Sequence, residues 1–325
     1  MALPTEGPPP FTDSPLRISD TRGADFADAI RQASQQLVAL DNGPLGVPVA
    51  EPAVRAFWIV RDRLDRADYD PRHGRDIRSA AAELAEVAGW ALFDVEQHAA
   101  ARRANQTALA LAREAGDASM ELLIRQNIAM CGEWTGNHPE ALAVTRGVLA
   151  QGALSPRVEA IFRVREAKGL AGLARTTEAV KALALARSLL DDGTRDSDPY
   201  WAWWVTPEEI DGHLGHVFQD AGRTGEAIEV FQRVVNGPAT VPVGHAGMSD
   251  ARLLDCLLRE RAWPDAEGLT HRIIAAVQAR SSQRVRSALG RAAEQGRGCD
   301  NAPPSLRDAL THLADMVGTH PLDFA

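Results

Sequence analysis

Lysine is almost absent from this chain of 325 residues, because only Lys168 and Lys181 contribute lysines to its 35 basic side chains. The 44 acidic residues outnumber the basic ones and set the formal net charge to −9 at pH 7. Binding to duplex nucleic acid depends on clustered Lys and Arg side chains that neutralise phosphates. We therefore expect no specific nucleic-acid partner.

One stretch, residues 280–297, is rich in arginine and contains a single acidic residue. As a helix it places Arg284 and Arg291 on one face. This pattern predicts a short exposed patch that contacts a phosphate or, preferably, an acidic protein partner.

Cysteine is also scarce. Cys131, Cys256 and Cys299 are far apart, odd in number and not spaced as metal ligands, which indicates a reducing compartment. No run approaches the ~18 apolar residues of a membrane-spanning helix, and the N-terminus lacks the apolar core of a signal peptide. We expect a cytoplasmic protein without a membrane partner.

The sequence motifs of common enzymes are missing as well. The chain contains no GxSxG, P-loop, HExxH or strand-linked GxGxxG pattern. We therefore assign no catalytic residue and expect neither a cofactor nor a metal.

What the chain does contain favours helices. Apolar residues make up 45% of it and aromatic residues only 5%, with alanine and leucine dominating. Apolar residues recur at helical spacing from Ala24 to Leu40, and strand alternation is not evident anywhere. Further helices are predicted over Ala53–Ala67, Ile77–Asp94 and His98–Ala115.

The most informative stretch runs from Ser197 to Phe231. Thr206 is a suitable cap for a helix that begins with Pro207 and two glutamates, and Gly222 is suited to end it. Large, small and aromatic residues in this helix, then Ala227 and Phe231 in the next, form the pattern of tetratricopeptide (TPR) repeats. Small residues are needed there because two antiparallel helices approach closely.

The same pattern recurs along the chain. Aligned on the key alanine of the second helix, the copies lie 40, 38, 48 and 39 residues apart, at Ala101, Ala141, Ala179, Ala227 and Ala266. We predict an all-α fold, a TPR-like α-solenoid of antiparallel helix pairs with extra helices at both ends. Its parts are a disordered Pro-rich tail (1–22), an N-terminal helical cap (23–72), TPR-like repeats (73–280) and C-terminal capping helices (281–325).

Two runs carry a family resemblance: AAELAEVAGWALFDVEQHAAARRANQTALALAREAGD and PYWAWWVTPEEIDGHLGHVFQDAGRTGEAIEVF. They resemble the C-terminal TPR-type sensor region of actinobacterial helix-turn-helix regulators of the Xre type, over roughly residues 24–317. The resemblance implies a sensor of a signalling peptide, a metabolite or another regulator. The DNA-binding domain of such regulators has no counterpart in this sequence.

In a TPR superhelix the first helix of each pair lines the concave groove. The repeat register, together with the tryptophan cluster before Thr206, nominates these ligand-binding residues: Trp90, Asn127, Met130, Trp134, Arg165, Trp204, Glu209, His213 and His216. Asn127 is suited to pair with the backbone of a bound peptide, unless it is simply solvated. Arg165 is suited to hold a carboxylate, unless a neighbour such as Glu166 engages it in a surface pair.

Two features have competing interpretations. The aromatic run at 200–204 either packs as core and rim or forms part of a ligand cage, with packing favoured. Glu209, His213 and His216 share one helix face, which suits a metal or an acid/base pair, but a polar groove face is the preferred interpretation.

We therefore interpret the chain as a ligand- or partner-binding regulatory module, possessing a groove for a peptide, a small molecule or a protein regulator. The alternative is an all-helical enzyme of specialised metabolism in which groove His, Glu and Asp residues act as acid and base. A closed pocket with a buried, pKa-shifted histidine or carboxylate would favour the enzyme, and an open groove would favour binding. We also expect a homodimer formed by a terminal helix pair.

Overall fold

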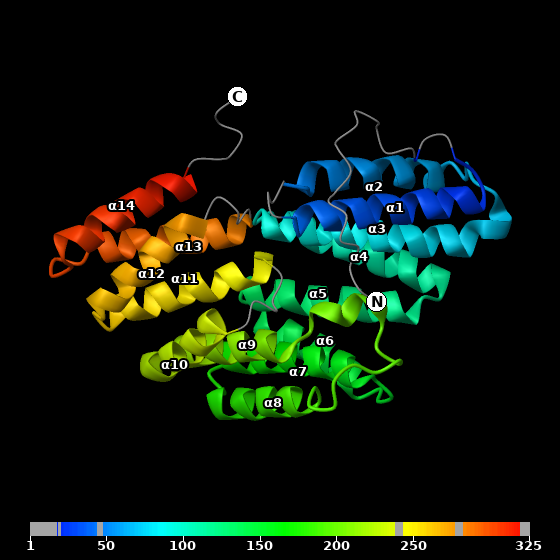
Figure 1. Ribbon diagram of the computed structural model, residues 1–325. Helices are drawn as coiled ribbons and strands as arrows, with labels where there is room; N and C mark the ends of the chain where they lie inside the picture. The colour runs from blue at the N-terminus through cyan, green and yellow to red at the C-terminus, as the bar shows by residue number, and fades with distance from the viewer. Residues whose placement is uncertain (1–17, 19–20, 44–47, 238–242, 277–281, 319–325) are drawn as a thin grey trace.

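All regular secondary structure in the described part of the chain is helical (Figure 1). The computed structural model describes residues 18, 21–43, 48–237, 243–276 and 282–318. The first two helices are α1 (Ala24–Asp41) and α2 (Ala50–Asp65), followed by the short 3-10 helix η1 (Pro71–His73). A second 3-10 helix, η2 (Tyr200–Trp204), precedes α9.

The remaining helices form antiparallel pairs, each joined by a short turn. The pairs are α3 (Gly74–Asp94) with α4 (His98–Ala115), α5 (Ala118–Trp134) with α6 (His138–Leu149), α7 (Pro156–Gly172) with α8 (Thr176–Ser188), α9 (Pro207–Asp220) with α10 (Thr224–Asn236), α11 (Val243–Arg259) with α12 (Trp263–Ala276), and α13 (Gln283–Arg297) with α14 (Pro304–Gly318). This architecture confirms the predicted all-α, TPR-like solenoid.

The turns within the pairs follow the predicted repeat register. Five turns contain a residue in the left-handed conformation, always five positions before the key alanine: Glu96, Gly136, Ala174, Gly222 and Arg261, with φ of 60°, 80°, 58°, 72° and 58°. A left-handed residue satisfies the last carbonyls of the first helix and reverses the chain. Three of the five are not glycine, although glycine adopts this conformation with the least strain.

We expect Ala174→Gly to raise the free energy of unfolding by about 0.5–1 kcal/mol, because relief of left-handed strain outweighs the entropy that glycine adds to the unfolded chain. Ala174 is exposed, so no side-chain packing is lost. The reverse change, Gly222→Ala, has open space for its Cβ and should destabilise by a similar amount. Urea unfolding of both variants measures the effect, and equal shifts of the same sign would contradict it.

Small residues allow the paired helices to approach, as the sequence predicts. A Cβ added to Gly215 would lie 2.5 Å from the ring of Phe231, and one added to Gly89 would lie 2.7 Å from the amide of Asn105. Thr206 caps α9 as predicted, since its side-chain oxygen accepts from the backbone N–H of Glu209 at 3.3 Å.

The ends of the chain are described only in part. Most of the segment predicted to be a disordered tail, residues 1–17 and 19–20, lies outside the described residues, as do residues 319–325. Ile18 is buried, and its carbonyl accepts from Arg63 at 2.9 Å. The division into tail, cap, repeats and C-terminal cap stays a prediction.

The solenoid curves until its last pair meets its first (Figure 1). Asp94, at the C-terminal end of α3, accepts hydrogen bonds from the Ser282 hydroxyl at 2.7 Å, the Gln283 backbone N–H at 3.2 Å and the Arg284 guanidinium at 3.0 Å. One turn further, Ser287 donates to Glu96 at 2.7 Å. We call these contacts the α3–α13 closure. Within the described ranges, no helix is long and apolar enough to cross a bilayer.

Candidate functional site

A cavity of about 250 Å³ lies among the first helices of successive pairs. It is lined by Trp90, Met130, Glu133, Trp134, His138, Arg165, Lys168, Gly172, Glu209, Gly212, His213, His216, Asp220, Met248, Ser249, Arg252 and Arg284. These residues come from α3, α5, α6, α7, α9, α11 and α13, so each of the six pairs contributes to it. Arg284 reaches it because the α3–α13 closure brings α13 beside α3.

The cavity brings together seven of the nine nominated residues, namely Trp90, Met130, Trp134, Arg165, Glu209, His213 and His216. Asn127 and Trp204 are not among its lining residues. Their ligand-binding role, like that of the seven, stays a prediction.

Asn127 belongs instead to a buried polar chain that crosses three helices. Its amide donates to Glu86 on α3 at 2.6 Å and accepts from Gln126 beside it. The Gln126 oxygen accepts from Arg165 on α7 at 3.2 Å, and Arg165 donates to Glu133 at 3.4 Å. Asn127 is therefore engaged by the protein's own side chains, and it is buried rather than solvated.

Glu86 and Glu133, the carboxyl groups at the two ends of this hydrogen-bonded chain, are both desolvated. Burial raises the pKa of Glu86 to about 7, although its hydrogen bond from Asn127 opposes the shift. Burial also raises the pKa of Glu133 to about 7, against the attraction of Arg165. Glu133 Oε1 is buried without a hydrogen-bond partner, and it belongs to a residue that lines the cavity.

Arg165 is not held by a sequence neighbour, as one interpretation proposed. It is buried, with 4% of its surface exposed, and its partners are Gln126 and Glu133. Glu166 pairs instead with Arg146 and Arg163, at 3.1 and 3.0 Å. The Arg165 guanidinium therefore lies at the cavity wall, and its one carboxyl partner, Glu133, is 3.4 Å away and partly protonated at neutral pH.

His213 and His216 are the most strongly desolvated imidazoles of the cavity. Burial lowers the pKa of both, and the nearby charges of Arg252 and Lys168 lower that of His216 further. Their rings lie 5.7 Å apart, and His213 lies 3.3 Å from Glu209. His213 Nε2 faces Glu209, whereas His213 Nδ1 and His216 Nε2 are buried without a hydrogen-bond partner.

Arg284 corrects the prediction of an exposed basic patch. Its guanidinium lies 5.0 Å from the ring centroid of Trp90, 4.7 Å from that of Phe93 and 5.6 Å from that of Trp134. Only 9% of Arg284 is exposed, and the nearby Arg286 is buried with its guanidinium bound to backbone carbonyls of α14. Of the two arginines that the sequence assigned to an outside partner, Arg284 makes contacts inside the protein and Arg291 is exposed.

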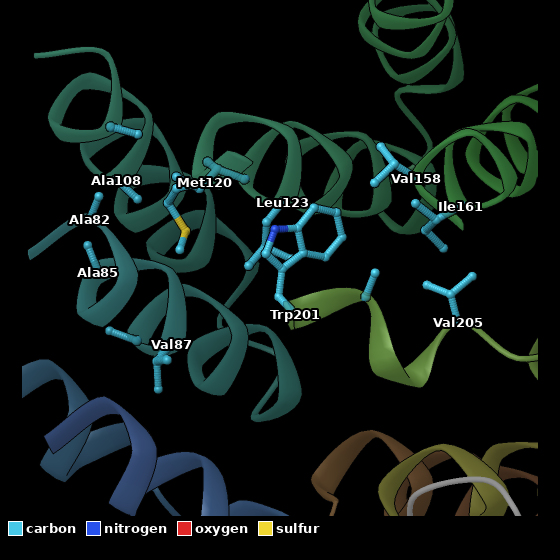
Figure 2. Close-up of a cluster of buried hydrophobic side chains, with 14 of the residues drawn as sticks. Ala82, Ala85, Val87, Ala108, Met120, Leu123, Val158, Ile161, Trp201 and Val205 are labelled. Atoms are coloured by element: carbon cyan, nitrogen blue, oxygen red, sulfur yellow. The ribbon is translucent and has the colours of Figure 1, made fainter. Parts of the chain in front are cut away.

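Within the aromatic run of η2, Trp201 packs as the preferred interpretation held, whereas Tyr200 and Trp203 are exposed. Trp201 is 5% exposed and donates to the Ser119 hydroxyl at 3.1 Å. Figure 2 shows its ring between Leu123 of α5 and Val158 and Ile161 of α7. The insertion between α8 and α9 thus covers part of α5 and α7.

Seven polar lining residues are not among the nine nominated from the sequence, namely Glu133, His138, Lys168, Asp220, Ser249, Arg252 and Arg284. Arg252 had a usable signal, since it occupies the same repeat position in α11 that Asn127, Arg165 and His213 occupy in theirs. Glu133 and Arg284 had none, because their place depends on helix rotation and on the α3–α13 closure.

No group of three or more His, Cys, Asp or Glu residues is arranged to hold a metal ion in the ranges that the structure describes. Glu209, His213 and His216 share a helix face as predicted, but they do not form such a group.

A solved structure of a Rap protein complexed with Competence and Sporulation Factor is similar to this chain. The sequence identity is 12% and the TM-score 0.56, covering 90% of this chain and 87% of that chain. The solved structure of the P58(IPK) TPR domain matches with 12% sequence identity and a TM-score of 0.25. That match covers 90% of this chain and 80% of the P58(IPK) chain. No protein-family model and no curated protein matches the chain. The likeness to the Rap protein supports the solenoid fold.

Proposed function

We propose that this protein is a regulatory binding module that senses a small organic molecule, or the end of a short peptide, in its cavity. The observation that carries the proposal is the set of buried polar atoms at the cavity wall that lack partners, on Glu133, His213 and His216. Buried polar groups are nearly always hydrogen-bonded, and an unsatisfied group requires an explanation. A polar ligand in the cavity would supply the missing partners.

The size of the site limits the ligand. A cavity of about 250 Å³ is near the lower end of ligand pockets, which begin at roughly 300 Å³. Trp201 and its neighbours in η2 occupy the surface of α5 and α7 beyond it. These features favour a compact ligand or a peptide terminus over a long peptide lying along the solenoid.

The proposed regulatory role follows from two likenesses. The chain resembles the sensor region of Xre-type regulators, and the similar solved structure is of a Rap protein complexed with Competence and Sporulation Factor. We infer that ligand binding here alters the contact with another regulator, which supplies the DNA-reading function. A homodimer through a terminal helix pair remains part of this proposal, and α2 exposes Trp58 and Ile59.

We expect Gly212→Leu to weaken ligand binding, because Gly212 lines the cavity and its Cβ would meet only Ser249 Oγ, at 3.4 Å. A leucine there fills the cavity without breaking the helix. A library of small organic molecules and short peptides is screened by thermal shift, and each hit is titrated. Hits should bind the variant at least about tenfold more weakly, a difference of 1.4 kcal/mol.

The matched control is Gly225→Leu on α10, an exposed helical glycine with open space around it. It should bind every hit as the wild type does. Hits that bind Gly212→Leu and wild type equally would show that the cavity is not the site and would overturn the proposal.

An enzyme is the second candidate, and a specific observation favours it. The cavity contains a carboxyl group with a pKa raised to about 7, Glu133, and a neutral imidazole beside Glu209, which are suited to general acid/base chemistry. Structural ion-pair networks perturb pKa values in the same way, and Arg165 makes Glu133 part of such a network. Incubating each hit with the protein for a long time and analysing the compound afterwards distinguishes a sensor from an enzyme. A sensor leaves the compound chemically unchanged.

A further inference from the structure

The charges around one side of the cavity do not balance. Lys168 lies 3.2 Å and Arg252 3.7 Å from the same carboxylate, that of Asp220. Arg252 also donates to the neutral side-chain oxygen of Gln219 at 3.1 Å. The group of Lys168, Arg252 and Asp220 therefore carries a net charge of +1 at the cavity wall, in a chain whose formal net charge is −9.

The opposite wall does not cancel this charge. Arg165 faces Glu133, whose pKa of about 7 leaves it partly protonated at neutral pH. Arg284 is neutralised by Asp94, outside the lining. His213 and His216 also line the cavity, and Lys168 depresses the pKa of both, together with Arg165 for His213 and Arg252 for His216. When the carboxylates of Glu209 and Asp220 are counted against Arg165, Lys168 and Arg252, and Glu133 is partly protonated, the lining keeps a small excess of positive charge.

We propose that the cavity binds an organic carboxylate, held by Lys168 and Arg252 with a hydrogen bond from His216. This inference rests on the proposed function, because it names the ligand class of the same cavity. Charge-assisted hydrogen bonds to a carboxylate are about twice as strong as neutral ones. The carbon body of the ligand lies against Met130 and the two tryptophans, Trp90 and Trp134, that line the cavity.

Carboxylate binding is coupled to proton uptake. The charged and titratable groups that face His213 and His216 come from every surrounding helix: Glu133 on α5, His138 on α6, Arg165 and Lys168 on α7, Glu209 and Asp220 on α9, Arg252 on α11 and Arg284 on α13. A bound anion opposes the cations among them, so it raises the pKa of both imidazoles and of Glu133. Affinity for the carboxylate therefore falls as pH rises through about 7, where Glu133 ionises.

Calorimetric titration with two matched pairs of probes tests the inference. Phenylacetate is compared with phenylacetamide, and the dipeptide Gly-Phe with its C-terminal amide, at pH 6 and pH 8. We expect the acid of at least one pair to bind ten times more tightly than its amide, and more tightly at pH 6. A preference for phenylacetate indicates a free acid as ligand, and a preference for Gly-Phe indicates a peptide terminus; either result supports the proposal.

The two lysines of the chain provide the matched variants. Lys168→Gln removes the cavity cation and should weaken acid binding about tenfold, whereas Lys181→Gln, on the exposed side of α8, should leave it unchanged. Circular dichroism verifies that both variants are folded. Equal binding of acid and amide, no acid binding at millimolar concentration, or equal affinity of the two lysine variants would overturn the inference.

The outcome also separates this inference from the proposed function. If uncharged or cationic compounds bind and Gly212→Leu blocks them, the carboxylate assignment is wrong and the sensing cavity stands. If no compound depends on Gly212, both proposals are wrong.

Discussion

Replacing Asp94 with alanine is expected to lower the free energy of unfolding by about 3 kcal/mol and to release the last helix pair from the first. The Asp94 and Arg284 side chains are only 13% and 11% exposed, and removal of one partner of a buried ion pair leaves the other charge uncompensated. The same carboxylate accepts the first backbone N–H of α13, which has no cap from its own segment. Loss of this cap contributes about 1 kcal/mol of the total.

Urea unfolding and amide hydrogen exchange measure the two parts of this prediction. Exchange should accelerate in the first turns of α13, while the amides of α7 and α8 keep their protection. Asp94→Asn retains an oxygen that can cap α13 but removes the negative charge. Its free energy of unfolding should therefore lie between those of the wild type and Asp94→Ala. Asp308→Ala, an exposed aspartate on α14, should change stability by less than about 0.5 kcal/mol. Unchanged exchange in α13 of Asp94→Ala would show that the closure does not hold the pair.

The features that sequence predicts well here are set by short-range contacts. The helix His98–Ala115 has the predicted bounds, and the cap at Thr206 and the turn at Gly222 form as expected. Capping and left-handed turns depend on a few neighbouring residues, which the sequence places side by side. The repeat spacing of the key alanines carries the same kind of information from one pair to the next.

The curvature of the solenoid is not predictable in the same way. The contacts of Asp94 with the start of α13 join residues separated by 188 to 190 positions. They depend on the small rotation of each helix pair relative to the next, which accumulates along the solenoid. A local sequence pattern does not determine this accumulated rotation. For this reason Arg284, a polar residue on an arginine-rich helix, was expected on the surface and lies instead over three aromatic rings.

The sequence predicted only part of the site, because repeat register carries only part of the information needed. Repeat register identifies which residues face inward, and seven nominated side chains do line the cavity. Register does not tell which inward residues bond to one another, so Asn127 was nominated for a ligand although Glu86 and Gln126 engage it. The aromatic insertion illustrates the same limit, because nothing in the order YWAWW specifies that Trp201 alone is deeply buried among its aromatic residues.

The buried polar chain has a consequence for the pH dependence of folding. Below pH 4.5, the ordinary pKa of Glu86, the carboxyl group is protonated in both the folded and the unfolded chain. Between pH 4.5 and about 7 the unfolded chain releases the proton while the folded chain keeps it, so stability falls as pH rises. Above about pH 7 the loss is complete and amounts to roughly 3 kcal/mol, at 1.36 kcal/mol per pH unit.

Glu86→Gln should therefore be more stable than the wild type by up to about 3 kcal/mol at pH 8 and nearly equal to it at pH 4.5. Glutamine cannot ionise, and its side-chain oxygen still accepts from Asn127, so the polar chain stays connected. Urea unfolding of both proteins from pH 4.5 to pH 8 measures the difference in their free energies of unfolding. Titration of Glu133 and of the histidines contributes equally to both proteins and cancels in this difference. Glu229→Gln, an exposed glutamate on α10, is the control and should show no such pH dependence. A Glu86→Gln variant whose stability runs parallel to that of the wild type would show that the pKa of Glu86 is the same in the folded and the unfolded chain.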